Sequence, residues 1–122
     1  MSNKSAGNDA LKDRLSRSSE ITITVTGRKS GRSISIPIWF VFDGENLYLL
    51  PVQGSDTQWY KNVLKSPLIR VEAGGSVAEL KAVPVTEPKQ VSSVIEKFRG
   101  KYAGDVKKYY SKFDVAVVVP IG

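Results

Sequence analysis

Two residue types that carry much of enzyme chemistry are missing from this chain, which has no cysteine and no histidine. The lack of cysteine excludes disulfides, thiol nucleophiles and thiolate metal ligands, and the lack of histidine removes the usual general base and the commonest metal ligand. A Ser-His-Asp hydrolase, a cysteine enzyme and a zinc enzyme are therefore excluded, and we expect no metal site. If the chain is a catalyst, we expect a bound organic cofactor to supply the reactive atoms.

Long hydrophobic runs are also missing. No apolar run approaches the roughly 20 residues that a membrane-spanning helix needs, and the first residues lack the apolar segment of a secretory signal. We therefore expect a cytoplasmic protein that does not enter the membrane. The 122 residues, 41% of them hydrophobic and 25% charged, suit one folded domain.

Acidic residues are fewer than basic ones, 12 against 18, which gives a net charge of +6 and favours an anionic partner. Three of the cations, Arg28, Lys29 and Arg32, fall in a short turn that also contains Gly27 and Gly31. Glycine lets a backbone turn sharply and expose its N–H groups, and such groups together with Arg and Lys bind phosphate. We interpret the turn as an anion site; the alternative is a solvated hairpin loop.

Alternating or continuous apolar residues in the rest of the sequence are typical of β-strands. Six strands are predicted, over residues 21–26, 33–42, 46–50, 68–73, 77–85 and 115–119. Two or three helices lie between them, over residues 57–65, 88–100 and 106–111. Residues 1–19 are predicted as a flexible tail or a short helix over residues 8–17 capped by Asn8 or Asp9, and residues 20–122 as one domain. The predicted fold class is mainly β with α additions, a small closed or partly closed barrel.

Pro37 lies inside the second predicted strand. Because proline has no N–H, it cannot complete a hydrogen-bond ladder in the middle of a sheet. We therefore expect this strand to lie at a sheet edge, to carry a bulge or to face a ligand. Any of these makes it a candidate wall of a site.

In a chain without histidine, a tyrosine hydroxyl is a plausible proton donor. Tyr102, Tyr109 and Tyr110 are the candidates near the C-terminus, and packing is an equally consistent role for each. Trp39 is open to the same alternatives of core, interface or site residue. The sequence does not choose among them.

Three segments occur in order and at suitable spacing: residues 26–31, 37–41 and 59–67, which read TGRKSG, PIWFV and WYKNVLKSP. On these segments the chain, from about Glu20 to Glu72, resembles the deazaflavin-dependent nitroreductase family, which belongs to the flavin-binding split β-barrels of the pyridoxamine phosphate oxidase superfamily. The resemblance implies a six-stranded antiparallel split barrel that forms a homodimer, with a cofactor in a groove at the subunit interface. It also implies an oxidoreductase that passes a hydride between a deazaflavin coenzyme (factor 420) and a small organic acceptor.

The chemistry of the turn and the resemblance together assign the site residues. We expect the cofactor to be held by Arg28, Lys29, Ser30, Gly31, Arg32, Pro37, Ile38, Trp59 and Asn62. The basic turn would bind the phosphate, and Pro37 and Ile38 would border the ring through backbone contacts. Trp59 and Asn62 would line the same groove from a helix. No side chain is assigned a catalytic role.

Two positions depart from the pattern of that family. Ser33-Ile34 stands where many members have Pro-Arg, and Gln53 stands where a lysine is often found. Both changes remove cations expected to hold the long acidic tail of the deazaflavin. FMN, whose anionic end is a single phosphate, is therefore an alternative cofactor.

Two other functions are compatible with the sequence. A non-catalytic barrel module could use the same groove to bind FMN, haem or another anionic ligand. The net charge of +6 also permits binding to nucleic acid. The cations flank one loop, however, and do not form a stripe interleaved with aromatic residues, so we do not expect a nucleic-acid partner.

Overall fold

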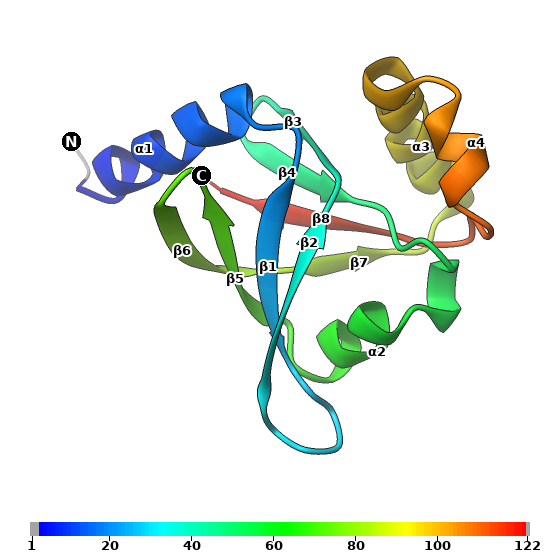
Figure 1. Cartoon of the computed structure of the whole chain (residues 1–122), viewed down its shortest axis with the longest axis horizontal. Helices are drawn as coiled ribbons and strands as arrows, with labels where there is room; N and C mark the ends of the chain where they lie inside the picture. Colours follow the sequence, from blue (N-terminus) through cyan, green and yellow to red (C-terminus); the bar gives the residue numbers. More distant parts are fainter. Residues whose placement is uncertain (1–2, 122) are drawn as a thin grey trace.

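Two four-stranded antiparallel sheets form the centre of the molecule in the computed structural model, which describes residues 3–121 (Figure 1). One sheet has the strand order β2-β1-β5-β6 and the other has the order β3-β4-β8-β7. The strands are β1 (Ile21–Thr26), β2 (Ser33–Ile38), β3 (Phe40–Asp43), β4 (Asn46–Leu49), β5 (Leu68–Ala73), β6 (Ser76–Lys81), β7 (Val83–Val85) and β8 (Ala116–Pro120). The predicted fold class, mainly β with α additions, is confirmed.

Two of the six predicted strands pass from one sheet to the other, and each of them therefore forms two strands. The run 33–42 breaks at Trp39 into β2 and β3, and the run 77–85 breaks at Ala82 into β6 and β7. The apolar alternation continues through the first break because Ile38 and Phe40, on either side of it, are both buried in the same core. Periodicity alone therefore does not reveal the change of sheet.

Helix α1 (Asn3–Arg17) packs on β5 and β6. Its side chains Leu11 and Leu15 are buried in the main hydrophobic core, together with the alternate residues of β1. The helix begins earlier than the predicted start at Asn8, so the predicted caps Asn8 and Asp9 lie inside it. The predicted short helix is therefore present in a longer form, and it packs on the sheet through Leu11 and Leu15.

Helices α3 (Pro88–Tyr102) and α4 (Asp105–Tyr109) lie together on one side of the molecule (Figure 1). Helix α3 begins where the Glu87 carboxylate accepts a hydrogen bond from the backbone N–H of Gln90, with proline at the first helical position. Its apolar face packs against the second sheet and forms a separate hydrophobic cluster that includes Phe98. None of the helices within residues 3–121 is long and apolar enough to cross a membrane.

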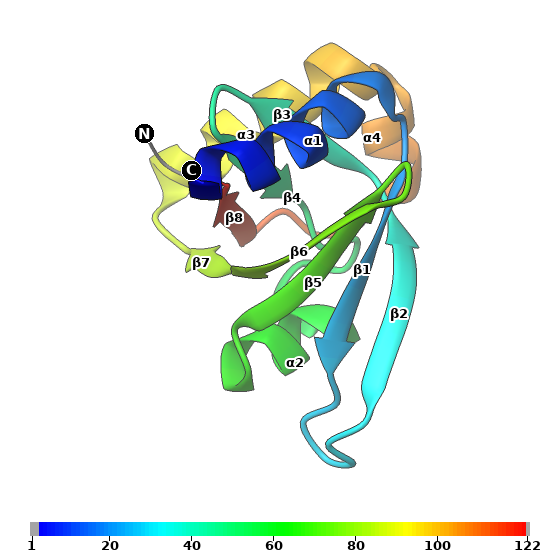
Figure 2. The ribbon, with the colours of Figure 1, turned by 90° about the vertical axis from the view of Figure 1, so that its left-hand side faces the viewer.

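Strands β1 and β2 form a hairpin whose tip, residues 27–32, projects beyond the body of the molecule (Figure 2). Strand β2 is the edge strand of its sheet, with Pro37 opposite Thr22 of β1. Of the three alternatives for the strand that contains Pro37, the structure therefore shows the first, a position at a sheet edge. The short helix η1 (Gly54–Asp56) and helix α2 (Gln58–Lys65) follow β4, and α2 packs on β1 beside the hairpin.

Candidate functional site

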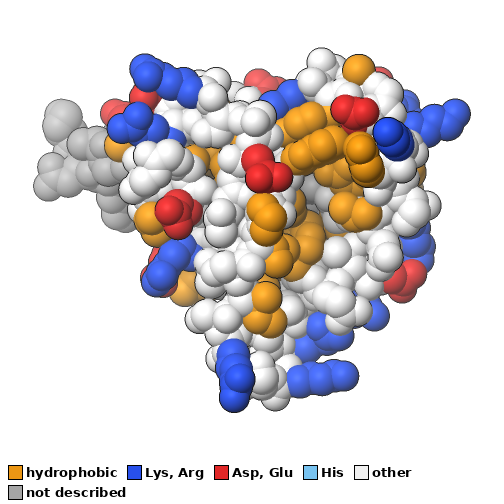
Figure 3. All heavy atoms as spheres, viewed as in Figure 1, with side chains coloured by type: hydrophobic (Ala, Val, Ile, Leu, Met, Phe, Trp, Pro, Cys, Tyr) orange, Lys and Arg blue, Asp and Glu red, His pale blue; other side chains and the backbone are white. Residues whose placement is uncertain are grey.

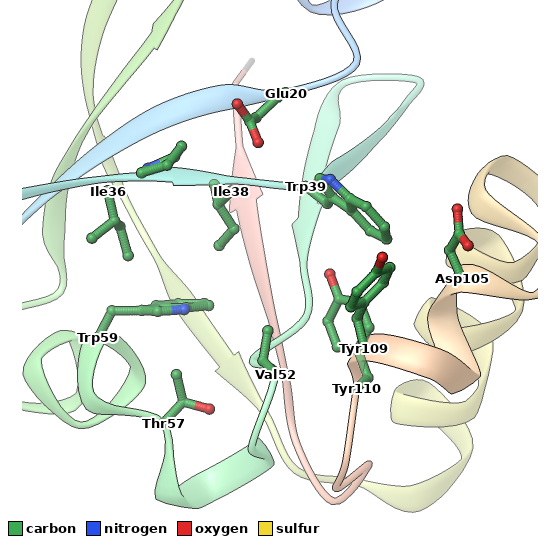
Figure 4. Close-up of a pocket in the computed structure, with 11 residues that line it drawn as sticks. Glu20, Ile36, Ile38, Trp39, Val52, Thr57, Trp59, Asp105, Tyr109 and Tyr110 are labelled. Atoms are coloured by element: carbon green, nitrogen blue, oxygen red, sulfur yellow. The ribbon is translucent and has the colours of Figure 1, made fainter.

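A cavity of about 570 Å³ opens between β2, α2 and α4 (Figure 4). It is lined by Glu20, Ile36, Pro37, Ile38, Trp39, Val52, Thr57, Trp59, Asp105, Tyr109 and Tyr110. Most of these side chains are apolar or aromatic, and both tryptophans of the chain are among them. Its volume falls in the range of about 300–1,000 Å³ that is typical of small-molecule sites. Such a cavity suits a planar aromatic ring.

The surface around the cavity divides into an apolar part and a basic part. Hydrophobic side chains form a band that follows β2 towards the cavity, and lysine and arginine side chains lie at the tip of the hairpin (Figure 3). The apolar cavity and the basic turn are therefore at the two ends of one surface.

Trp39, at the point where the chain changes sheet, forms one wall of the cavity. Its ring is stacked on Tyr102 of α3, with centroids 4.4 Å apart and planes at 6°. The Tyr102 hydroxyl accepts a hydrogen bond from the Phe40 N–H at 3.1 Å, and lies 2.9 and 3.0 Å from the carbonyl oxygens of Phe40 and Ser19, to which it can donate. Tyr102 therefore positions both the Trp39 ring and the backbone next to it.

Of the three candidate proton donors, Tyr109 and Tyr110 line the cavity, whereas Tyr102 stacks on Trp39. Burial raises the pKa of Tyr110, and the nearby Tyr102 adds to this effect. Burial also raises the pKa of Tyr102, against the opposing effect of its hydrogen bond to Phe40. Both hydroxyls therefore keep their protons at neutral pH, and the hydroxyl of Tyr110 belongs to a cavity-lining residue.

The basic turn is fastened to α2 by Arg28. Its guanidinium donates from Nη1 to Asn62 Oδ1 at 2.8 Å and to the Gln58 carbonyl at 3.4 Å, and from Nη2 to Gln58 Oε1 at 2.8 Å. The Arg28 backbone N–H donates to the same Asn62 oxygen at 3.0 Å, and Lys65 Nζ donates to the Arg28 carbonyl at 3.1 Å. Arg28 therefore holds the turn in place and is not a free cation.

A small hollow of about 240 Å³ lies under the turn. It is lined by Gly27, Arg28, Lys29, Ser30, Ile34, Gln58 and Asn62. Hydrogen bonds within the described residues occupy the N–H groups of Gly27, Arg28, Gly31 and Arg32. Among those residues no acceptor is found for the N–H groups of Lys29 and Ser30, which are therefore open to an anion together with the exposed side chains of Lys29 and Arg32.

The structure places the nine predicted site residues in three groups. Pro37, Ile38 and Trp59 line the large cavity. Arg28, Lys29, Ser30 and Asn62 line the hollow under the turn. Gly31 and Arg32 lie at the exposed tip, outside the described residues that line either space. Helix α2 connects the first two groups, because Trp59 and Asn62 are three residues apart and project from nearly the same helix face.

The loop before α2 is held by the segment that precedes β8. Asp114 accepts hydrogen bonds from the Ser55 N–H at 2.9 Å and the Ser55 hydroxyl at 2.5 Å, and Lys112 pairs with Asp56 at 3.2 Å. Burial by itself raises the pKa of Asp114, but the two hydrogen bonds from Ser55 and the charge of Lys112 lower it overall. These contacts connect the two segments that supply Val52 and Tyr110 to the cavity.

Sequence reasoning gave no site role to several lining residues: Glu20, Val52, Thr57 and Asp105. Glu20 directly precedes β1, and Asp105 is the first residue of α4. These residues come from the ends of different elements, so no local pattern in the sequence groups them. They come together only in the folded protein, where these distant segments line one cavity.

Comparisons with known proteins were consistent with this architecture. A family model described as an uncharacterized protein conserved in bacteria (DUF2255) matches residues 12–116. No curated protein shows a significant match to the sequence.

Several solved structures share the fold. An F420-H2 dependent reductase (FDR-A) is 20% identical with a TM-score of 0.65, covering 83% of this chain and 93% of that one. A protein described as a domain-swapped dimer is 18% identical with a TM-score of 0.67, covering 91% and 97%. The haem storage protein HutZ from Vibrio cholerae is 12% identical with a TM-score of 0.69, covering 92% and 87%. The resemblance inferred from the sequence is therefore confirmed at the level of fold: a split barrel shared with an F420-H2 dependent reductase and a haem storage protein.

Proposed function

The chain belongs to the DUF2255 family, and we propose that it is an oxidoreductase that binds a flavin-type cofactor and transfers a hydride to a small organic acceptor. One observation carries the proposal. Helix α2 presents Trp59 to the apolar cavity and Asn62 to the hollow under the basic turn. A space for an aromatic ring and a site for an anion are thus joined by a single rigid element, as a molecule with a planar ring and a phosphate requires.

The residues present fit such a cofactor. Trp59, Ile38 and Pro37 supply apolar surface for the ring and exclude water from it. Lys29 and Arg32, with the open N–H groups of Lys29 and Ser30, supply the charge and donors that a phosphate needs. When bound, the reduced ring supplies the hydride.

The chain's own part in the reaction is binding, orientation and proton donation. Arg28 and Asn62 hold the turn, and Trp39, fixed by Tyr102, forms the wall of the cavity opposite α2. The hydroxyls of Tyr109 and Tyr110 are the candidate donors of a proton to the reduced acceptor. Orientation of two reactants in one cavity is the main source of rate enhancement in this proposal.

The deazaflavin coenzyme is the first choice of cofactor, and FMN is the second. The reductase of the same fold supports the deazaflavin, whereas the short basic turn and Gln53 also suit the single phosphate of FMN. We also propose a homodimer, supported by the domain-swapped dimer of the same fold. The mass of the protein in solution, measured by light scattering, tests this assignment; a monomer at assay concentration contradicts it.

The cofactor is tested by titration of the purified protein. Because both tryptophans line the cavity, quenching of tryptophan emission reports its occupancy directly. We expect saturable quenching by the deazaflavin or by FMN, and weaker binding of riboflavin, which has the ring without the phosphate. Hydride transfer is then followed by the loss of the reduced cofactor's absorption on addition of a nitroaromatic or quinone. Absence of saturable binding by either cofactor would overturn the proposal.

A second candidate function is a non-catalytic module that stores or carries haem or a flavin. The shared fold of HutZ favours it. With no histidine or cysteine in the chain, the iron of a haem would need another ligand, and the cavity offers the hydroxyls of Tyr109 and Tyr110. Tight binding of a flavin or haem without turnover of any acceptor supports this candidate and contradicts the first.

A further inference from the structure

We propose that the large cavity selects aromatic molecules that carry a positively charged group, and that Glu20 and Asp105 are the residues that select them. This inference deepens the proposed function by naming the charge class of the acceptor, and its role in the reaction rests on that function. The binding preference itself concerns only the cavity, and it can be measured with no cofactor present.

The charge of the cavity is opposite to that of the chain. The chain carries a net charge of +6, but the only charged residues among the 11 described residues that line the cavity are Glu20 and Asp105. Figure 4 shows the two carboxylates on different sides, with Trp39 and the two tyrosines, Tyr109 and Tyr110, between them. A cavity of this kind repels an anion and attracts a cation.

Neither carboxylate has a counterion within residues 3–121. No ion pair between described residues includes Glu20 or Asp105. The nearby lysines have other contacts: Lys101 Nζ donates to the Phe40 carbonyl at 2.9 Å, and Lys108 Nζ lies 5.3 Å from the centre of the Tyr109 ring. Neither lysine is among the described residues that line the cavity. A ligand is therefore the natural source of positive charge at these two carboxylates.

The aromatic walls favour the same class of ligand. A cation is attracted to the face of an aromatic ring, most strongly to tryptophan. Trp39 is held in one orientation by its stack on Tyr102, and Tyr109 meets it edge to face at 5.7 Å and 87°. Rigid rings between two carboxylates can accept a planar apolar body together with an ammonium or protonated ring nitrogen. An aromatic molecule that carries a carboxylate has neither the attraction of a cation to the aromatic rings nor its attraction to Glu20 and Asp105.

In the proposed reaction, the cation-bearing molecule is the hydride acceptor. The cofactor's anionic end lies at the basic turn, on α2 and the hairpin, whereas Glu20 and Asp105 lie at the start of β1 and of α4. The two ends of the surface therefore have opposite charge. This separation lets one groove hold an anionic cofactor and a cationic acceptor without exchange of their positions.

The test compares three probes with the same ring system: biphenylmethylammonium, biphenylmethanol and biphenylacetate. Each is titrated into the protein without cofactor, and tryptophan emission reports occupancy. We expect the ammonium compound to bind about five- to tenfold more tightly than the alcohol, and the carboxylate to bind most weakly. The preference should shrink as salt is raised, because exposed charges are screened.

The double variant Glu20→Gln with Asp105→Asn tests the residues. We expect the preference for the ammonium compound over the alcohol to fall below about twofold, while the affinity for the neutral alcohol shows that the cavity is intact. The matched control is Glu45→Gln with Glu72→Gln, which removes the same charge from exposed positions outside the cavity. The control should keep the full preference.

Equal affinity for the three probes, absence of saturable binding by the ammonium compound, or an unchanged preference in the cavity double variant would each overturn the inference. Its failure is distinguishable from failure of the proposed function. If the cofactors do not bind but the charge preference is found, the proposed function fails and the binding preference stands. If a cofactor binds and turns over but the preference is absent, only the inference fails.

Discussion

The side-chain oxygen of Asn62 accepts two hydrogen bonds from Arg28, one from Nη1 at 2.8 Å and one from the backbone N–H at 3.0 Å. Asn62 is 5% exposed, so this pair fixes the basic turn to α2 from inside the protein. The most conspicuous cation of the turn therefore acts on the conformation of the turn, and the proposed contacts to a phosphate fall mainly to Lys29, Ser30 and Arg32.

Replacement of Asn62 by alanine should lower both stability and cofactor affinity. The change leaves two Arg28 donors without their acceptor, and such a loss costs about 1–3 kcal/mol. Urea denaturation measures the stability, and FMN titration measures the affinity. Asn62→Asp, which keeps an acceptor oxygen for Arg28, is the control for stability and should lose less of it, whereas its negative charge in the hollow should weaken FMN binding. An Asn62→Ala variant as stable as the parent would contradict this account of the turn.

The double variant Lys29→Ala with Arg32→Ala should affect binding alone. Both side chains are exposed, and neither takes part in an ion pair among the described residues, so the free energy of unfolding should stay within about 0.5 kcal/mol of the parent. Affinity for FMN should fall by about tenfold or more, since hydrogen bonds to charged groups contribute about 1.5–3 kcal/mol each. Affinity for riboflavin should not change. An equal loss of affinity for FMN and riboflavin would contradict the assignment of the phosphate to the basic turn.

Gly54 and Gly44 form a matched pair of glycines. Both have positive φ, 56° and 67°, so alanine at either position is strained. A Cβ on Gly54 would also collide with the Asp114 carboxylate, whereas a Cβ on Gly44 meets open space. Gly44→Ala should cost about 1 kcal/mol of unfolding free energy and Gly54→Ala clearly more. Thermal denaturation of the two variants measures the difference in their stability. Equal costs would contradict the prediction, because they would mean that the contact between the new Cβ and Asp114 adds no strain.

The carboxylate of Asp114 should make stability depend on pH in the acid range. Hydrogen bonds from Ser55 and the charge of Lys112 outweigh burial and lower the pKa of Asp114 in the folded state. A lowered pKa means that the charged form stabilises the fold, so this contribution is present above the pKa of the unfolded state, about 4, and is lost as pH falls through the lower folded value. Asp114→Asn should reduce the urea midpoint at pH 7 and flatten its fall below about pH 4. Glu45→Gln is the control, and a parallel pH profile for Asp114→Asn and the parent would contradict the assignment.

Tyr102→Phe should destabilise the point where the chain changes sheet. The ring can still stack on Trp39, but the Phe40 N–H loses its acceptor. The expected cost is about 1–2 kcal/mol, with a shift of tryptophan emission because Trp39 is next to the change. Tyr109→Phe is the comparison. Because Tyr109 is 53% exposed, this substitution should leave the free energy of unfolding unchanged. If the two variants are equally stable, the hydroxyl of Tyr102 does not have the role assigned to it.

Much of the fold could be predicted from the sequence, because the strand patterns depend on residues that are close together in the chain. Alternation of Ile21, Ile23 and Val25 with threonines marks β1, and its buried and half-buried pattern follows that alternation. The edge position of β2 follows from Pro37, which has no N–H to donate. The break at Trp39 could not be predicted, because Ile38 and Phe40 on either side of it face the same core and the alternation continues.

The candidate site could be predicted only in part from the sequence. The nine predicted site residues were grouped by sequence spacing and resemblance, and seven of them line the cavity or the hollow under the turn. The role of Arg28 could not be predicted, because its partners Gln58 and Asn62 lie 30 and 34 residues further along the chain. Glu20 and Asp105 were not visible either, since nothing in the residues next to them distinguishes them from other exposed carboxylates.

The amino-acid sequence by itself determined which reactive groups this protein lacks, since it has no thiol and no imidazole. It also determined the strand pattern and the basic turn, because periodicity and glycine-bounded turns act over a few residues. Tertiary structure alone decided that Arg28 holds the turn, that Trp39 and Trp59 face one cavity, and that two carboxylates from distant segments line that cavity. The reason is physical: hydrogen bonds and cavities depend on distances between atoms, and those distances are set by how the sheets and helices pack.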